Sequence, residues 1–238
     1  MSRKPFVFKQ FSVNQDRCAM KIGTDGVLLG AWVSVENNPF AILDIGAGTG
    51  IIGLMLAQRS NAEVIDAIEI DDDAYEQCVD NFETSPWGDR LFCYHAGLDE
   101  FVDEIDDKYE LIVSNPPFYS ENYKTDNQKR DIARFQDALP FNHLIDSASK
   151  LLTEQGKFAV IIPFKEEAKF IELASKRKLY PNKILRVKGS PNSEIKRSLL
   201  ECSFCESEIK IENLIIETDR HQYTEDYINL TKNFYLKM

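Results

Sequence analysis

The sequence lacks any apolar run close to the roughly 20 residues that a membrane-spanning helix requires. It also lacks an apolar stretch behind the basic residues at its start, which a secretory signal peptide would have. Together these absences predict a cytoplasmic protein with no membrane partner.

Cysteine and histidine are scarce, with five and three residues respectively. The cysteines are odd in number and scattered, which argues against a disulfide framework and predicts reduced thiols. Cys202 and Cys205 form a lone CxxC pair, which we interpret as two strand residues rather than a metal or redox site. We therefore expect no bound metal, and the sequence indicates no obligate protein partner.

Positive charge is also in deficit, because 28 Lys and Arg face 39 Asp and Glu, for a net charge of −11. Taken alone, this balance disfavours a nucleic-acid partner. The cations are nevertheless clustered near the start and between residues 176 and 197, where RNA could bind locally. The alternative is an ordinary solvated face. The candidate RNA contacts are Arg17, Arg130, Arg134, Lys188, Lys196 and Arg197.

Apolar runs alternate with segments of helical period, and 238 residues suffice for one large α/β domain. A first helix is expected to begin at residues 24–26, which can cap it. Strands are expected at residues 41–45, 61–68, 90–95, 109–114 and 157–162, and helices at 51–59, 71–84, 99–107, 141–152 (ending near Gly156) and 166–177. Further on we expect a hairpin at 180–188 and 196–205, an extended piece at 208–218 and a helix at 226–235.

This order predicts an α/β fold with a doubly wound, mostly parallel sheet of seven strands. Helices are expected on both faces of the sheet, and the antiparallel hairpin at one edge. Residues 121–138 are polar and charged without a clear period, so we expect a loop there.

A glycine-rich segment, DIGAGTG at residues 44–50, joins the first buried strand to a helix. Glycines let the backbone turn tightly and approach a ligand closely. Glu69 ends the next strand, where a carboxylate can accept ribose hydroxyls. A dinucleotide fingerprint would need a glycine at Ile51, and Asp44 would repel a pyrophosphate. S-adenosylmethionine has no phosphate and carries two cationic groups. It therefore suits the glycine segment better than a dinucleotide does.

A second candidate site is Asn115-Pro116-Pro117-Phe118, directly after the strand at 109–114. The prolines fix the backbone and leave its carbonyls free. The Asn115 side-chain oxygen and the Pro116 carbonyl can accept the two N–H bonds of a planar amine and stabilise the charge that develops on it during attack. Phe118 can stack on the ring. The alternative is an ordinary strand-ending turn. The motif does not distinguish adenine N6 from cytosine N4 or a glutamine amide.

The glycine segment, Glu69 and the Asn115–Phe118 motif together resemble the class I S-adenosylmethionine-dependent amino methyltransferases, which have a Rossmann-like fold. The opening FKQFSVNQDRCAMKIGTDGVLLGAW and the ending YTEDYINLTKNFYL are similar to those of the bacterial tRNA1(Val) adenine-37 N6-methyltransferases. The resemblance covers nearly the whole chain. It implies methyl transfer from S-adenosylmethionine to N6 of an adenosine in tRNA, with adenosine 37 of a valine tRNA as the best expectation. The alternative is another planar amine, in rRNA, DNA or a protein glutamine.

The resemblance also implies roles for individual residues. Residues 1–40 would form an extension that covers the cofactor site, and residues 41–238 the methyltransferase domain. Relatives place an acid against the cofactor adenine near the end of the third strand. Here Gly97 stands at that point and Asp99 follows two positions later, so either one is the candidate contact. The implied cofactor-binding residues are Lys21, Thr24, Gly26, Asp44, Gly46, Gly48, Gly50, Glu69, Ile70, Gly97 and Asn115.

Overall fold

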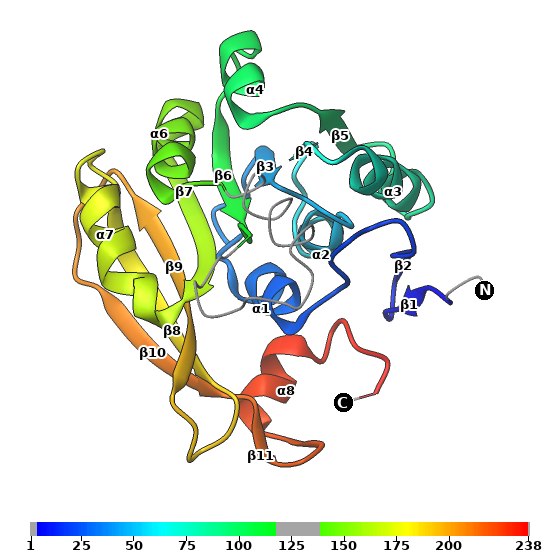
Figure 1. Cartoon of the computed structure of the whole chain (residues 1–238), viewed down its shortest axis with the longest axis vertical. Helices are drawn as coiled ribbons and strands as arrows, with labels where there is room; N and C mark the ends of the chain where they lie inside the picture. The colour runs from blue at the N-terminus through cyan, green and yellow to red at the C-terminus, as the bar shows by residue number, and fades with distance from the viewer. Residues whose placement is uncertain (1–3, 118–138, 238) are drawn as a thin grey trace, which may run out of the picture.

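A single eight-stranded sheet forms the centre of the protein (Figure 1). The structure is a computed structural model that describes residues 4–117 and 139–237. The strand order is β10-β8-β9-β7-β6-β3-β4-β5. The strands are β3 (Ala41–Ile45), β4 (Val64–Glu69), β5 (Leu91–His95), β6 (Tyr109–Ser114), β7 (Leu152–Pro163), β8 (Tyr180–Lys188), β9 (Ile195–Ser203) and β10 (Lys210–Ile215). Every neighbouring pair is parallel except those that β9 makes with β7 and β8.

Helices cover both faces of this sheet (Figure 1). They are α1 (Thr24–Trp32), α2 (Ile51–Arg59), α3 (Asp72–Glu83), α4 (Leu98–Glu104), α6 (Phe141–Leu151), α7 (Glu167–Ser175), α8 (Glu225–Thr231) and the 3₁₀ turn η1 (Phe164–Glu166). Side chains of α1, α2, α3 and α8 pack in one hydrophobic cluster, and those of α4, α6 and α7 in a second. Alternate residues of β3 divide between the two, since Ile42 belongs to the first cluster and Leu43 to the second.

The predicted doubly wound α/β fold is confirmed, but the sheet has one strand more than the seven expected. The extra strand is β10, which pairs in parallel with β8 and occupies the outer edge. The β8–β9 hairpin therefore lies inside the sheet. In β10 only Leu214 is buried, so its sequence carries little of the apolar pattern that marks a strand.

Several boundaries also differ from the prediction: β4 begins at Val64 rather than residue 61, α4 ends at Glu104 rather than residue 107, and α8 ends at Thr231 rather than residue 235. Strand β7 begins at Leu152 rather than residue 157, and its register with β6 shifts between the Tyr109–Leu152 and Leu111–Lys157 pairs. Gly156 lies within this strand and does not end a helix. Helix α1 has Gly23 as its N-cap with no side-chain cap, so the expected capping role of the Thr24 segment is wrong.

The two ends of the described chain lie together. Two short strands, β1 (Phe6–Val7) and β2 (Ser12–Val13), pair near the start, and β11 (Glu217–Asp219) pairs with β12 (Gln222–Tyr223) near the end. Phe8 forms a β-bridge with Tyr235, and their rings stack with centroids 5.7 Å apart. All five cysteines are free. Within the described ranges, no helix combines the length and apolar character that a membrane crossing requires.

Candidate active site

The carboxyl ends of β3 and β6 lie side by side, because these strands are parallel neighbours with Ile45 opposite Ser114. The buried Ser114 hydroxyl donates a 2.8 Å hydrogen bond to the Ile45 carbonyl and holds the two ends together. The first glycine of the glycine segment, Gly46, comes directly after Ile45, and Asn115 comes directly after Ser114. The two sequence motifs therefore meet at one edge of the sheet, where ligands bind in open α/β folds.

The three glycines of this segment all adopt the left-handed conformation, with φ of 74° at Gly46, 56° at Gly48 and 76° at Gly50. A Cβ at Gly50 would lie 2.6 Å from Phe82 and 2.8 Å from the Cys78 sulfur, so helix α3 fills the space there. At Gly46 and Gly48 a Cβ would meet nothing within 4 Å. The segment is thus closed against α3 at its end and open at its first two glycines, where a ligand can approach the backbone.

Asp44 is the first residue of the glycine segment and is fully buried. Its Oδ2 accepts a 3.3 Å hydrogen bond from the Gly53 N–H, while Oδ1 has no partner among the described residues. Burial raises the pKa of Asp44 to about 7, and the charge of Glu69 adds to the rise, whereas the Gly53 hydrogen bond opposes it. An unpartnered, buried carboxylate oxygen is costly in isolation, and a cationic ligand group would satisfy it.

Glu69 is held by three backbone N–H groups. Its Oε2 accepts from Gly48 at 2.8 Å, and its Oε1 accepts from Ile70 at 2.8 Å and Asp71 at 2.9 Å. A carboxylate offers about four acceptor positions, so one remains on Oε2 for a ligand hydroxyl. The fixed orientation suits a ribose beside the glycine segment.

The end of β5 supplies the next part of the site. A Cβ on Gly97 would lie 3.7 Å from Cδ1 of the exposed Ile70, so these two positions are adjacent. Asp99 turns away toward α6, where its carboxylate pairs with His143. Of the two candidate adenine contacts, Gly97 is the one that lies beside Ile70. His95 also lies here, with its Nε2 3.1 Å from the Ile70 carbonyl.

Asn115 is half-buried, and its side chain has no hydrogen-bond partner within residues 4–117 and 139–237. Pro116 behind it is buried, and Pro117 is half-buried. Phe118, Arg130, Arg134 and the expected loop at 121–138 lie outside the described residues.

The structure spreads the other candidate residues more widely. Lys21 and Thr24 are exposed before and at the start of α1, while Gly26 is buried where a Cβ would come within 3.3 Å of Ile51 on α2. Close packing of two helices thus accounts for this glycine. Arg197 donates from Nε to the Asp25 carboxylate at 2.7 Å, which ties β9 to α1.

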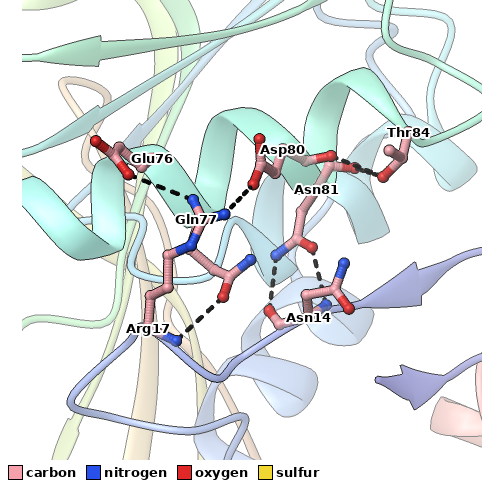
Figure 2. Close-up of polar contacts among 7 residues, drawn as sticks. All are labelled: Asn14, Arg17, Glu76, Gln77, Asp80, Asn81 and Thr84. Carbon is pink, nitrogen blue, oxygen red and sulfur yellow. Dashed lines mark hydrogen bonds and ion pairs between the residues drawn. The ribbon is translucent and has the colours of Figure 1, made fainter. Parts of the chain in front are cut away.

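Arg17 is likewise engaged within the protein, since its guanidinium lies 2.8 Å from Asp80 and 3.4 Å from Glu76 on α3 (Figure 2). Lys188 ends β8 and Lys196 lies near the start of β9, so both stay at the sheet edge that carries Asn115. Of the four described RNA candidates, two are bound to carboxylates of the protein itself.

Comparison with known proteins decides the family. The family described as methyltransferase small domain matches residues 27–176. The chain belongs to this methyltransferase family. A relative from Flavobacterium johnsoniae, named tRNA1(Val) (adenine(37)-N6)-methyltransferase, is 69% identical over 98% of this chain and 100% of its own length. Relatives with the same name from Christiangramia forsetii and Bacteroides fragilis are 63% and 44% identical, each over 100% of both chains.

Solved structures agree on the fold of this methyltransferase. A crystal structure described as a predicted O-methyltransferase from Agrobacterium tumefaciens covers 88% of this chain and 96% of its own, with a TM-score of 0.67 and 19% identity. A ribosomal protein L11 methylase from Lactobacillus delbrueckii has a TM-score of 0.53 and 16% identity, covering 75% of this chain and 76% of its own.

S-adenosylmethionine is the cofactor of this methyltransferase, and the residues present fit it. The open backbone at Gly46 and Gly48 leaves room for it, the unpartnered Asp44 oxygen suits its cationic methionine end, and Glu69 retains an acceptor for its ribose. Sequence reasoning named these residues as candidates because each stands near the end of a strand or in the turn directly after it. It missed Ser114 and His95, which also end strands but carry no motif.

Proposed function

We propose that this methyltransferase transfers a methyl group to N6 of adenosine 37, next to the anticodon of a valine tRNA, in the cytoplasm. The observation that carries the proposal is the likeness, over 98% of this chain, to a relative with that name. The geometry of the β3–β6 edge supports the amine chemistry, because it sets an acceptor side chain beside the cofactor loop.

The protein's own contribution is to hold and orient. S-adenosylmethionine, when bound, supplies an electrophilic methyl group on a cationic sulfur. Asp44 and the glycine segment would hold its methionine end, and Glu69 would hold its ribose. The Asn115 oxygen and the Pro116 carbonyl accept the two N–H bonds of the adenine amine, which favours a pyramidal nitrogen and stabilises its developing positive charge. In-line alignment would let the N–CH3 bond form as the S–CH3 bond breaks, with neutral S-adenosylhomocysteine as the leaving group. The extra proton on the methylated amine would pass to water, so no tuned base is required.

An anticodon-loop base must leave its stack to reach this edge. Residues 1–40 are assigned as the extension that covers the cofactor, since residues 14–17 pack on α3 beside the glycine segment.

Incubation of the protein with unmodified tRNA and labelled cofactor, followed by nucleoside digestion, tests the function. N6-methyladenosine at position 37 of valine tRNA is expected. Label confined to rRNA, DNA or protein would overturn the proposal in favour of another planar amine.

Three lysines gather at the same sheet edge and provide the contact for tRNA phosphates. Lys165 follows β7, Lys188 ends β8 and Lys196 lies one residue into β9, where Lys188 pairs with Ile195. Strands β7 and β8 both run parallel to β6 in the sheet, so these lysines lie at the edge where Asn115 begins. Phosphate contacts position the RNA without reading its sequence.

Replacing Lys188 and Lys196 with glutamine is expected to weaken tRNA binding about tenfold and to reduce the slope of log affinity against log salt by about 1 to 2. Cofactor affinity is expected to stay unchanged. The matched control replaces Lys178 and Lys210, which precede β8 and begin β10 at the other end of these strands. Binding measured by fluorescence anisotropy at several salt concentrations checks this. An equal loss of tRNA affinity in both double variants would show that Lys188 and Lys196 do not form the tRNA contact.

A further inference from the structure

The N-terminal segment at residues 14–22 is attached to α3 by two buried amide side chains. Gln77 and Asn81 lie one turn apart on α3 and are only 2% and 0% exposed. Buried polar side chains of this kind are expensive unless they are hydrogen-bonded. Figure 2 shows both reaching toward the N-terminal segment.

Asn81 holds the backbone of Asn14 on both sides. Its Oδ1 accepts the Asn14 N–H at 2.8 Å, and its Nδ2 donates to the Asn14 carbonyl at 2.9 Å (Figure 2). The Asn81 side chain therefore pairs with one residue of the segment much as a neighbouring strand would. Among the described residues, the Gln77 side chain makes one hydrogen bond, in which its Oε1 accepts the Arg17 N–H at 3.2 Å.

The same Asn81 side chain also holds the glycine segment. Its Nδ2 donates a second hydrogen bond, 2.9 Å long, to the carbonyl of Thr49. Thr49 precedes Gly50, which is packed against Phe82 and Cys78 of the same helix. One fully buried carboxamide thus joins two pieces of chain, and both of its N–H donors and its oxygen are used.

The segment then passes close to the cofactor site. Cys18 is buried, and its pKa is raised to about 12 by that burial and by the nearby carboxylates of Glu69 and Asp71. The Gln15 side chain accepts the Ile22 N–H at 3.0 Å and closes residues 15–22 into a loop ahead of α1. The N-terminal segment is therefore held at Asn14, next to the glycine segment. Further along, at Cys18, it passes near Glu69, the carboxylate assigned to the ribose.

We propose that Asn81 is a positioning residue that couples the docking of residues 14–22 to the conformation of the glycine segment. Docking the segment fixes Asn81, and Asn81 fixes the Thr49 carbonyl. The cofactor then binds a loop that is already ordered, and by linkage the bound cofactor stabilises the docked segment to the same extent. The inference rests on cofactor binding at the glycine segment and is independent of the methyl acceptor.

Limited trypsin digestion of the full chain tests the coupling, because Arg17 and Lys21 are cleavage sites within the segment. In the natural protein, saturating S-adenosylmethionine is expected to slow cleavage there about tenfold, within the usual range of coupling between sites. In Asn81→Leu the cofactor is expected to leave the cleavage rate unchanged and to bind about tenfold more weakly. Gln77→Leu is the matched control. It loses a bond to the segment but none to the loop, so cleavage is faster while the cofactor still slows it.

Equal protection of Asn81→Leu and the natural protein by the cofactor overturns the coupling. Hydrogen exchange on the natural protein gives a second test that needs no folded variant, since the amides of residues 14–22 are expected to exchange more slowly with cofactor present. Unchanged exchange there also overturns the inference. Calorimetry separates the two proposals: a natural protein that does not bind the cofactor refutes the proposed function, whereas binding without protection of the segment refutes only the coupling.

Discussion

Replacing Asn115 with alanine is expected to lower kcat for methyl transfer by about 10²- to 10³-fold, the usual loss for one preorganised group at a reacting centre. In the proposed mechanism the carboxamide oxygen is one of two acceptors on the substrate amine, and water cannot hold the same fixed orientation. Cofactor affinity is expected to stay within about twofold, because Asp44, Glu69 and the glycine segment remain in place. Single-turnover rates with saturating tRNA, together with calorimetry of cofactor binding, measure the two effects separately.

Stability is expected to change little in this variant, since the Asn115 side chain is half-buried and makes no hydrogen bond with the described residues. Asn182→Ala is the matched control. It removes a half-buried carboxamide that donates hydrogen bonds to the Cys205 carbonyl and the Ser207 hydroxyl, outside the site. A kcat for Asn115→Ala within about threefold of the natural value would show that the acceptor pair is not the source of catalysis.

Asp44→Asn is expected to weaken cofactor binding by about 10- to 100-fold at pH 8, because it removes the charge that we propose faces the cationic methionine end of the cofactor. The pKa of Asp44 is about 7, so the natural protein has this charge above pH 7 and loses it below. Its cofactor affinity is therefore expected to rise about tenfold from pH 6 to pH 8. Glu69 is the neighbouring charge that adds to the raised pKa, and it is kept in the variant. Titration calorimetry across this range is expected to give a nearly flat profile for Asp44→Asn, and an unchanged slope would contradict the role of Asp44.

Asp44→Asn is expected to stabilise the cofactor-free protein against unfolding, although it weakens cofactor binding. Asp44 binds a proton more tightly in the folded state, with a pKa of about 7 against 3.8 in the unfolded chain. The folded state therefore binds more protons between these values, and the free energy of unfolding falls as pH rises from about 4 to 7. The carboxamide introduced by Asp44→Asn carries no charge, so the variant is expected to be more stable at pH 8 by an amount on the order of 2 kcal/mol.

Urea unfolding at pH 5 and pH 8 checks this expectation. Asp66 is a second buried carboxyl whose pKa is raised by burial, although a hydrogen bond from the Tyr109 hydroxyl opposes the rise. It is present in both proteins, so the difference between them isolates Asp44. A variant whose stability depends on pH as steeply as the natural protein would remove Asp44 as the source.

Sequence reasoning succeeded where the signal was local. Strand β3, the glycine segment and α2 follow one another with an apolar run, left-handed glycines and a helical period, and each was predicted within a residue. It failed where neighbours in space decide the structure. The sequence predicts a helix end near Gly156, which instead lies in a strand that β6 and β9 support, and β10 carries only one buried side chain.

The site divides in the same way. Asp44, Glu69 and Asn115 stand at strand ends, so their positions follow from the order of elements alone. Asn81 forms hydrogen bonds with Asn14, which is 67 positions away in the sequence, and with Thr49, which is 32 positions away. No local sequence pattern predicts such contacts. Arg17 and Arg197 looked like free cations because the sequence does not reveal the acids that pair with them.

The junction of Phe8 with Tyr235 has a practical consequence for handling the protein. The Lys9 N–H donates to the Phe234 carbonyl at 2.8 Å, so the last residues help to support β1 and β2. These strands lead directly to Asn14, which Asn81 joins to the cofactor loop. An affinity tag or a trimmed carboxyl end is therefore not a neutral alteration, and donor affinities compared between differently tagged preparations will include a contribution from that distant junction.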